Sequence, residues 1–324
     1  MIDPESIWGI YQMSGFEHIP VLFNECISGL NINENGVYAD GTAGGGNHAL
    51  GIGLRLSVKG HLICLDRDID AIRACSKKLG GLNCTLTLLN DSFTALPAYL
   101  HESSLMLDGL LLDLGVSSHQ LDTPQRGFSY MSDGVLDMRM DGKASFSAKE
   151  LVNTYSKEEL ERVFFEYGEE KYSRSIASLI VESREKKPIE TTYELVQIIK
   201  NAMPVKALKE KQHPAKRVFQ AIRIEINDEL NQLEKLLTEI IDYIKPGGRI
   251  AVITFHSLED KLVKKIFAGF EKPCTCPPDF PVCVCGKVSL GKAIKVIYPT
   301  EDEVKANPRA RSAKLRIFMK EKAK

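Results

Sequence analysis

The segment from Val37 to His48, with the sequence VYADGTAGGGNH, constrains the fold of this chain more than any other. An apolar run ends at Asp40, glycines occupy positions 44–46, and a sequence compatible with a helix begins at Asn47. Glycine tolerates positive φ and lets the backbone approach a ligand closely. The free N–H groups at a helix start favour a negative or polar ligand group. The segment therefore predicts a strand, a binding loop and a helix that hold a nucleotide-like ligand.

The loop differs from two well-known nucleotide-binding motifs. No Lys follows the glycines, which argues against a phosphate-binding P-loop. The spacing is not G-x-G-x-x-G, which argues against NAD. An aspartate just before the glycines suits a ligand with a positive end, and S-adenosylmethionine carries an ammonium and a sulfonium that Asp40 could face. A tight strand-to-helix turn without a ligand is the alternative.

The same strand-to-helix alternation continues along the chain. Strands are expected at 37–40, 61–66, 85–89, 109–113 and 249–255. Helices are expected at 47–56, 69–79, 93–101 and 228–244, with a turn at 245–248. Apolar strands that alternate with helices predict a parallel sheet covered on both faces. Two late runs, 293–298 and 314–319, predict a closing β-hairpin.

The alternation stops after Asp113, and the following region reads as helices only. Capping-box patterns open three of these helices: Ser147 with Glu150, Ser156 with Glu159, and Thr191 with Glu194. The region is too long for a simple crossover. We therefore expect residues 117–225 to form an inserted helical subdomain, residues 17–116 and 226–324 to form a discontinuous core, and residues 1–16 to form a leader.

Composition narrows the class of protein. Hydrophobic residues make up 44% and charged residues 26% of 324 residues, as in soluble globular proteins. The sequence contains no apolar run of about 18 residues, the length that would predict a membrane span. The N-terminus also lacks a signal pattern, so a cytoplasmic location is expected. The net charge of -1 argues against bulk charge as the means of binding nucleic acid, but allows a local basic face. The oligomeric state stays open, and a homodimer is possible.

Acidic residues end or follow successive predicted strands. Asp66 lies at the position where a carboxylate accepts hydrogen bonds from ribose hydroxyls. Asp91 is expected to take an adenine amine and Phe93 to lie against the ring. Because ligands bind beyond the carboxyl ends of strands in open α/β sheets, we expect Asp40, Asp66, Asp91 and Asp113 to converge at one edge.

Asp113 is the candidate catalytic residue. A cytosine amine is a weak nucleophile because its lone pair is delocalised into the ring. A carboxylate that accepts its N–H can activate the amine and take up a proton. Asp113 is expected either to do this or to hold the amino group of the cofactor. His256, which follows the last central strand, is expected to orient the base or a carboxylate, and a purely structural histidine is the alternative. Asp68 is expected to cap a helix.

These residues belong to motifs that resemble the bacterial MraW (RsmH) family of small-subunit rRNA cytosine-N4 methyltransferases. The resemblance runs from about residue 18 to residue 316. The matching segments are 18–22, Asp40-Gly41-Thr42 through Gly46 with His48, 111–118 with Gln120-Leu121-Asp122, 126–129, 136–140, His213-Pro214-Ala215, Arg217, Phe219-Gln220-Ala221 with Arg223, Phe255-His256-Ser257-Leu258-Glu259-Asp260 and 307–312.

The resemblance implies a class I S-adenosylmethionine-dependent methyltransferase with a Rossmann-like α/β sheet and an inserted all-helical domain. It also implies methylation of one cytidine in the decoding region, at the P site of 16S rRNA, with the small ribosomal subunit as partner. The transfer step needs no metal. The cofactor contacts expected from the residues and the resemblance are Asp40, Gly44, Gly46, Asn47, His48, Asp66, Phe93, Asp113 and Gln120.

The chain departs from the family at two places. Asn47 stands where members usually have Gly, and Val135 replaces a usual Pro. General amino-methyltransferases place an aromatic residue where this chain has Val116, so another aromatic must hold the base; Phe128, Tyr130 and Phe255 are candidates. The residues expected to contact RNA are Phe128, Lys216, Arg217, Arg223, Arg309 and Arg311.

Four cysteines lie within twelve residues, at positions 274, 276, 283 and 285. The cluster suits zinc in ligand type but lacks the usual C-x2-C spacing. Reduced, metal-free thiols in a surface loop are the alternative, and we assign no metal from the sequence.

Two other functions stay open at this point. One is a methyltransferase that acts on a small molecule or a protein. The other is a non-catalytic RNA-binding or ribosome-assembly factor that retains the cofactor fold.

Overall fold

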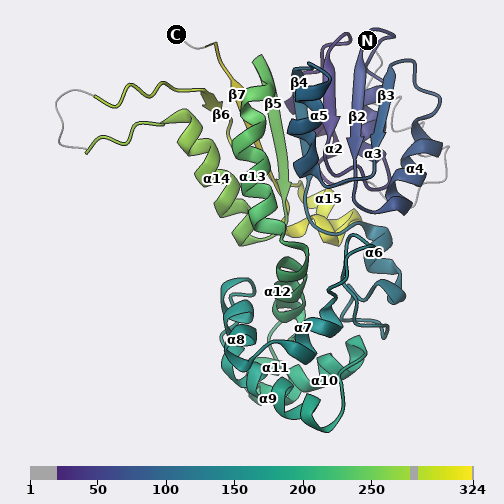
Figure 1. Cartoon of the computed structure of the whole chain (residues 1–324), viewed down its shortest axis with the longest axis vertical. Helices are drawn as coiled ribbons and strands as arrows, with labels where there is room; N and C mark the ends of the chain where they lie inside the picture. Colours follow the sequence, from purple (N-terminus) through teal and green to yellow (C-terminus); the bar gives the residue numbers. More distant parts are fainter. Residues whose placement is uncertain (1–19, 278–283, 323–324) are drawn as a thin grey trace.

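A computed structural model describes residues 20–277 and 284–322 of the chain, and the expected leader at 1–16 lies outside this range. Its centre is a seven-stranded sheet with the order β3-β2-β1-β4-β5-β7-β6 (Figure 1). The strands are β1 (Val37–Asp40), β2 (His61–Leu65), β3 (Thr85–Leu89), β4 (Leu107–Asp113), β5 (Ile244–Thr254), β6 (Gly291–Ala293) and β7 (Lys314–Lys320).

The first five strands pair in parallel, and β7 runs antiparallel between β5 and β6. This confirms the predicted class I S-adenosylmethionine-dependent methyltransferase fold. The predicted hairpin was partly wrong, because β6 comprises Gly291–Ala293, and beyond it Ile294 and Ile297 make separate backbone contacts with β7.

The turn predicted at 245–248 was also wrong, because these residues lie within β5. Leu107 of β4 pairs with Ile244 of β5, and the next pair is Gly109 with Arg249. The chain therefore advances two residues along β4 and five along β5 between these two pairs. The extra residues form an irregularity in the strand, with Gly247 at a φ of 88°. Asp108 fixes it by accepting a 2.6 Å hydrogen bond from Lys245 Nζ.

Alternating strand residues face two hydrophobic layers. Leu111 and Ala251 pack with α2 (Phe23–Leu30), α3 (Asn47–Gly53) and α4 (Ile69–Leu79) on one face. Leu110 and Val252 pack with α5 (Leu96–Glu102), α13 (Glu229–Ile240) and α14 (Ser257–Glu271) on the other. The sheet is therefore covered on both faces, as the apolar strands predict.

The long connection from β4 to β5 is mainly helical and lies at one end of the sheet (Figure 1). The three predicted capping boxes are present and open α7, α8 and α10. The helices are α6 (Ser118–Asp122), α7 (Ala148–Thr154), α8 (Lys157–Glu166), α9 (Ser173–Lys186), α10 (Thr192–Ala202), α11 (Val205–Leu208) and α12 (Lys216–Asn227). A third hydrophobic cluster is built from residues 116–226 of this connection. We propose from this separate core that residues 117–225 form an inserted subdomain.

None of the helices within the described ranges is long and apolar enough to span a bilayer.

The core of the connection can be tested at two adjacent phenylalanines. Phe164 is fully buried, whereas Phe165 is 66% exposed. Phe164→Ala is expected to cost about 3–5 kcal/mol of unfolding free energy, because it removes buried contacts and leaves a cavity. Phe165→Ala, the matched control, is expected to change stability by less than about 0.5 kcal/mol. Urea denaturation measures both, and equal losses would contradict the described packing.

Candidate active site

A cleft of about 970 Å³ opens beyond the carboxyl ends of β1 and β4. β1 pairs with β2 on one side and with β4 on the other, so the strand order reverses between β1 and β4. Such a switch point leaves a crevice between diverging connections, and ligands bind there in open α/β sheets. The volume is typical of small-molecule sites.

The glycine loop after β1 forms one wall. Gly44 has a φ of 48° and Gly46 a φ of 76°, both in the left-handed region that glycine favours. Gly46 is the N-cap of α3. A Cβ added at Gly45 would meet no atom of the described residues within 4 Å, so the loop backbone faces open space. The wall therefore offers backbone to a ligand, as predicted.

Asp66 ties this loop to the next one. Its Oδ2 accepts from the Gly44 N–H at 2.8 Å and its Oδ1 from the Asp68 N–H at 2.9 Å. Burial raises the pKa of Asp66. The carboxylate lines the cleft, in the place predicted for a ribose contact.

Asp68 caps α4 as predicted, and it has a second role that the sequence analysis missed. Its Oδ1 accepts from the Asp70 N–H, while its Oδ2 accepts from Gln120 Nε2 at 3.1 Å and from Arg126 Nη1 at 2.6 Å. Burial alone would raise the pKa of Asp68, but these hydrogen bonds outweigh it and lower that pKa. Asp68 therefore joins the sheet to the start of the helical connection.

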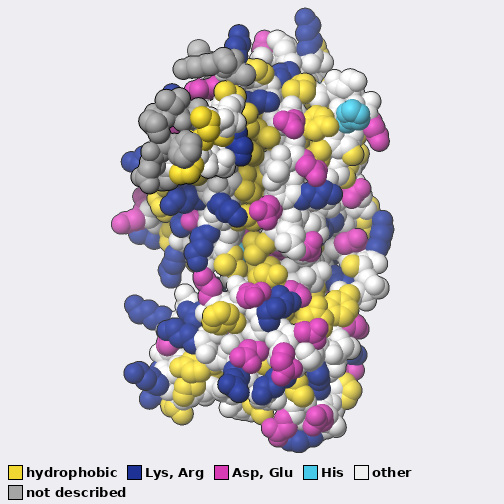
Figure 2. Space-filling model, turned by 60° about the vertical axis from the view of Figure 1, so that its left-hand side comes forward, with side chains coloured by type: hydrophobic (Ala, Val, Ile, Leu, Met, Phe, Trp, Pro, Cys, Tyr) yellow, Lys and Arg dark blue, Asp and Glu magenta, His cyan; other side chains and the backbone are white. Residues whose placement is uncertain are grey.

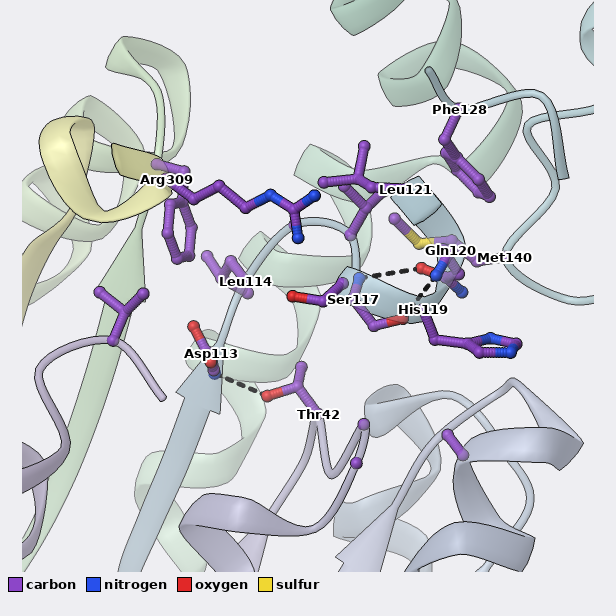
Figure 3. A pocket seen from close by; sticks show the side chains of 18 of the residues that line it. Thr42, Asp113, Leu114, Ser117, His119, Gln120, Leu121, Phe128, Met140 and Arg309 are labelled. Carbon is purple, nitrogen blue, oxygen red and sulfur yellow. Dashed lines mark hydrogen bonds between the residues drawn. The ribbon is translucent and has the colours of Figure 1, made fainter. Parts of the chain in front are cut away.

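Arg126 also donates to the carbonyls of Arg139 and Met140. Sequence alone could not pair it with Asp68, because 58 residues separate the two. The Gln120 amide is similarly committed, since its Oε1 accepts from the Ser117 N–H (Figure 3). Gln120 lines the cleft as predicted.

Asp113 lies at the end of β4 and faces the cleft (Figure 3). Its N–H donates to Thr42 Oγ1 at 2.6 Å, which fixes its backbone against the glycine loop. Its Oδ1 has no hydrogen-bond partner among the described residues. Burial, followed by the charges of Asp40 and Glu259, raises the pKa of Asp113 to about 8. The Asp113 carboxyl therefore offers a buried oxygen to a ligand in the cleft.

His48 contacts the Asp113 carboxyl and bears on whether that carboxyl is protonated. Its Nε2 lies 3.2 Å from the Val21 carbonyl, an acceptor, so Nε2 carries the proton. Burial lowers the pKa of His48 to about 4, so the ring is neutral at pH 7. The Nδ1 lone pair therefore faces Asp113 Oδ2 at 3.5 Å, a contact that favours a protonated carboxyl.

His256 also lines the cleft, but both ring nitrogens face Glu259. Its Nδ1 accepts from the Glu259 N–H at 3.4 Å, and its Nε2 lies 3.0 Å from Glu259 Oε1. The N–H groups of Phe255 and His256 donate to Glu259 Oε2. The ring thus caps α14, and its buried Nε2 makes no hydrogen bond with the described residues. The catalytic role predicted for His256 stays a prediction.

Four predicted site residues do not line the cleft. Asp40 is buried beneath the loop, where Oδ1 accepts from the Thr42 N–H. Gly46 turns behind the loop and packs toward Cys75. Asp91 is exposed and accepts from the Ser92 N–H. Of the four acids predicted to converge, Asp66 and Asp113 therefore line the cleft, whereas Asp40 and Asp91 do not. Arg217 lies outside the lining as well.

Arg223 lines the cleft but is committed elsewhere. Its Nε and Nη2 donate to the two oxygens of Glu229 at 2.8 and 2.9 Å, with both side chains largely buried. It therefore holds the junction of α12 and α13, and its predicted contact with RNA stays a prediction.

The remaining predicted residues line the cleft. Asn47 lines the cleft, and its Oδ1 accepts from Lys78 Nζ. Phe93 also lines the cleft, and the guanidinium carbon of Arg67 lies 5.8 Å from the centre of its ring. Arg309 extends across the opening and pairs with Asp122, and Phe128 lies on the opposite side (Figure 3). Lys216 and Arg311 also belong to the lining.

Two groups of side chains within the described ranges could hold a metal ion. Glu229, His256 and Glu259 place ligand atoms within 4.8 Å of one another. Arg223 and the backbone N–H groups already satisfy the two carboxylates, so an ion pair accounts for this group. The second group consists of cysteines outside the cleft.

The Asp68–Arg126 pair can be compared with an exposed pair of the same chemistry. The Arg126 and Asp68 side chains are 20% and 9% exposed, whereas those of Arg73 and Asp70 are 69% and 56% exposed. Arg126→Ala is expected to cost about 3 kcal/mol of unfolding free energy, because it leaves a buried carboxylate without its cation. Arg73→Ala is expected to cost less than about 1 kcal/mol. Similar losses in urea denaturation would argue against Asp68 as a structural junction.

Comparison with known proteins identifies the family. The chain matches the MraW methylase family over residues 15–321. It is 50% identical over 309 residues to "Ribosomal RNA small subunit methyltransferase H 2" of Agathobacter rectalis, covering 94% of this chain and 98% of that protein. It is 51% identical over 308 residues to "Ribosomal RNA small subunit methyltransferase H" of Clostridium botulinum, covering 94% and 99%. These matches, together with the cleft at the switch point, establish that the chain belongs to the MraW methylase family.

Proposed function

We propose that this protein transfers a methyl group from S-adenosylmethionine to the N4 amine of one cytidine at the P site of 16S rRNA. The observation that carries the proposal is the Asp113 carboxyl, which lies in the cleft with an unpartnered oxygen and a pKa raised to about 8. Near-full-length relatives named as small-subunit rRNA methyltransferases support the substrate class.

The residues of the cleft fit the cofactor. Asp66 offers a carboxylate where ribose hydroxyls bind in related folds. The loop at Gly44 and Gly45 offers exposed backbone, and Phe93 offers an aromatic surface. Asp113 offers an acidic group to a cationic ligand. S-adenosylmethionine supplies a methyl group made electrophilic by its sulfonium.

Asp113 is proposed as the proton acceptor of the transfer. The N4–methyl bond forms as the methyl–sulfur bond breaks, and the proton that N4 loses passes to the Asp113 carboxylate. A base with a pKa near the working pH suits this role. Neutral His48 leaves that proton on Asp113, because a pKa of about 4 makes the ring a poor competitor. The rest of the site aligns donor and acceptor.

The opposite wall of the cleft is proposed to hold the RNA. Phe128, Tyr130 and Phe255 line the cleft and could stack on a base. Lys216, Arg309 and Arg311 place cations around the same opening. Figure 2 shows Lys and Arg side chains gathered along one edge of the face that it displays, although the net charge is -1. Phosphate contacts of this kind set affinity and leave the choice of base to the cleft.

A methylation assay tests the proposal directly. The protein is incubated with methyl-labelled S-adenosylmethionine and small ribosomal subunits that lack the modification, and the digested RNA is analysed by mass spectrometry. Label in N4-methylcytidine is expected. Asp113→Asn is expected to lower the rate at least about 100-fold, because the proton acceptor is lost.

Asp91→Asn is the matched control, since Asp91 also follows a strand but is exposed and outside the cleft. It is expected to retain wild-type activity. Label in another nucleoside would contradict the N4 assignment. Wild-type activity in Asp113→Asn would remove Asp113 from the chemistry.

Cofactor affinity is expected to depend on pH. A cationic ligand favours the carboxylate form of Asp113, so binding below pH 8 must release a proton. Affinity for S-adenosylmethionine should therefore rise from about pH 6 to about pH 8, by at most about tenfold per unit for each proton released, and then level off.

Titration calorimetry in buffers of different ionisation enthalpy measures this proton release. Asp113→Asn should reduce the slope of affinity against pH without abolishing it, because burial also raises the pKa of a second carboxyl near the site, Asp40, to about 7. An unchanged slope in that variant would show that Asp113 does not face the cationic part of the ligand.

A further inference from the structure

The cysteine cluster lies on an arm that leaves the body of the protein after α14. The chain extends outward beyond Glu271 and returns at β6 (Figure 1). Two backbone hydrogen bonds close the base of the arm: the Leu290 N–H donates to the Phe270 carbonyl at 2.9 Å, and the Glu321 N–H donates to the Leu290 carbonyl at 3.0 Å. The base is therefore anchored to the sheet.

Beyond Leu290, which packs against the core at the base, hydrophobic burial contributes little to the described part of the arm. Its described residues, 272–277 and 284–290, form neither helix nor strand. Val284 is 72% exposed and Val288 is 54% exposed. Segments that cannot build a core are commonly held by a disulfide or a metal ion.

Three thiols meet on this arm. The Sγ atoms of Cys274, Cys276 and Cys285 lie within 4.8 Å of one another, and those of Cys274 and Cys285 are 3.8 Å apart. Zinc binds thiolates at about 2.3 Å in a tetrahedron, which places two sulfur atoms about 3.8 Å apart. A disulfide requires about 2.05 Å. The observed separation therefore matches two thiolates on one zinc ion.

The composition of the arm agrees with a site for a metal cation bound by sulfur. Lys272 and Lys287 each lie two residues from one of these cysteines, and residues 272–277 and 284–290 contain no acidic side chain that would offer a competing oxygen ligand. The other described cysteines differ in position, because Cys26, Cys64, Cys75 and Cys84 are buried in the core.

We propose that Cys274, Cys276 and Cys285 bind a structural zinc ion that fixes the arm. These thiolates supply three of the four ligands that a structural zinc site takes. Cys283, the remaining cysteine of the motif, lies outside the described residues. The site is separate from the cleft and takes no part in the transfer of a methyl group.

Metal analysis of the full-length protein, purified under reducing conditions, tests the proposal. About one zinc ion per chain is expected. Cys274→Ser, Cys276→Ser and Cys285→Ser should each lose most of it. Val284→Ser, a change at an exposed position beside Cys285, should retain it. Unchanged affinity for S-adenosylmethionine in the cysteine variants would show that the body of the protein stays folded.

Two further measurements examine the bonding. Replacement of zinc by cobalt should give the near-ultraviolet absorption of thiolate-to-cobalt charge transfer, weakened in each cysteine variant. Removal of zinc by a chelator should speed tryptic cleavage after Lys287, which is exposed on the arm. The proposal is overturned if the reduced wild-type protein binds no added zinc, if its cobalt form shows no thiolate band, or if the thiols prove to form a disulfide.

Discussion

The site depends on the reversal of strand order between β1 and β4. Because β1 pairs in parallel on both sides, the connections that follow β1 and β4 diverge and leave a crevice between them. The crevice brings together a glycine loop with free backbone and the Asp113 carboxyl, one oxygen of which has no hydrogen-bond partner among the described residues. Thr42 joins the two, since its hydroxyl accepts from the N–H of Asp113. The raised pKa of that carboxyl is thus a consequence of topology as much as of residue type.

The second organising contact is the ion pair between Asp68 and Arg126. It connects the loop after β2 to the beginning of the helical connection, through a carboxylate that also caps α4. The cofactor wall and the proposed RNA wall therefore share one buried group. Arg223 and Glu229 make a comparable junction between α12 and α13, where the helical connection returns to the sheet. Both ends of the connection are therefore fixed by largely buried charge pairs.

Much of this arrangement could be predicted from local sequence. The parallel strands, the glycine turn and the three capping boxes follow from periodicity and from residue preferences within a few positions. The convergence of Asp66 and Asp113 follows from the rule for strand ends. The differences concern the direction in which individual side chains point, which periodicity does not predict. Asp40 accepts from the Thr42 N–H two positions along and lies beneath the loop, and Arg223 pairs with Glu229 six positions along, across the junction of α12 and α13. The contact between Asp68 and Arg126 was missed for another reason, because 58 residues separate the two.

The position of β7 has a consequence for biosynthesis. This strand follows both β5 and β6 in the sequence, yet it lies between them and pairs with both. A growing polypeptide can assemble β1 to β5 while it is still being translated, but β5 keeps an open edge until residues 314–320 emerge. The seven-stranded sheet therefore forms only after β7 has been synthesised, and a chain truncated before residue 314 would expose that edge to aggregation.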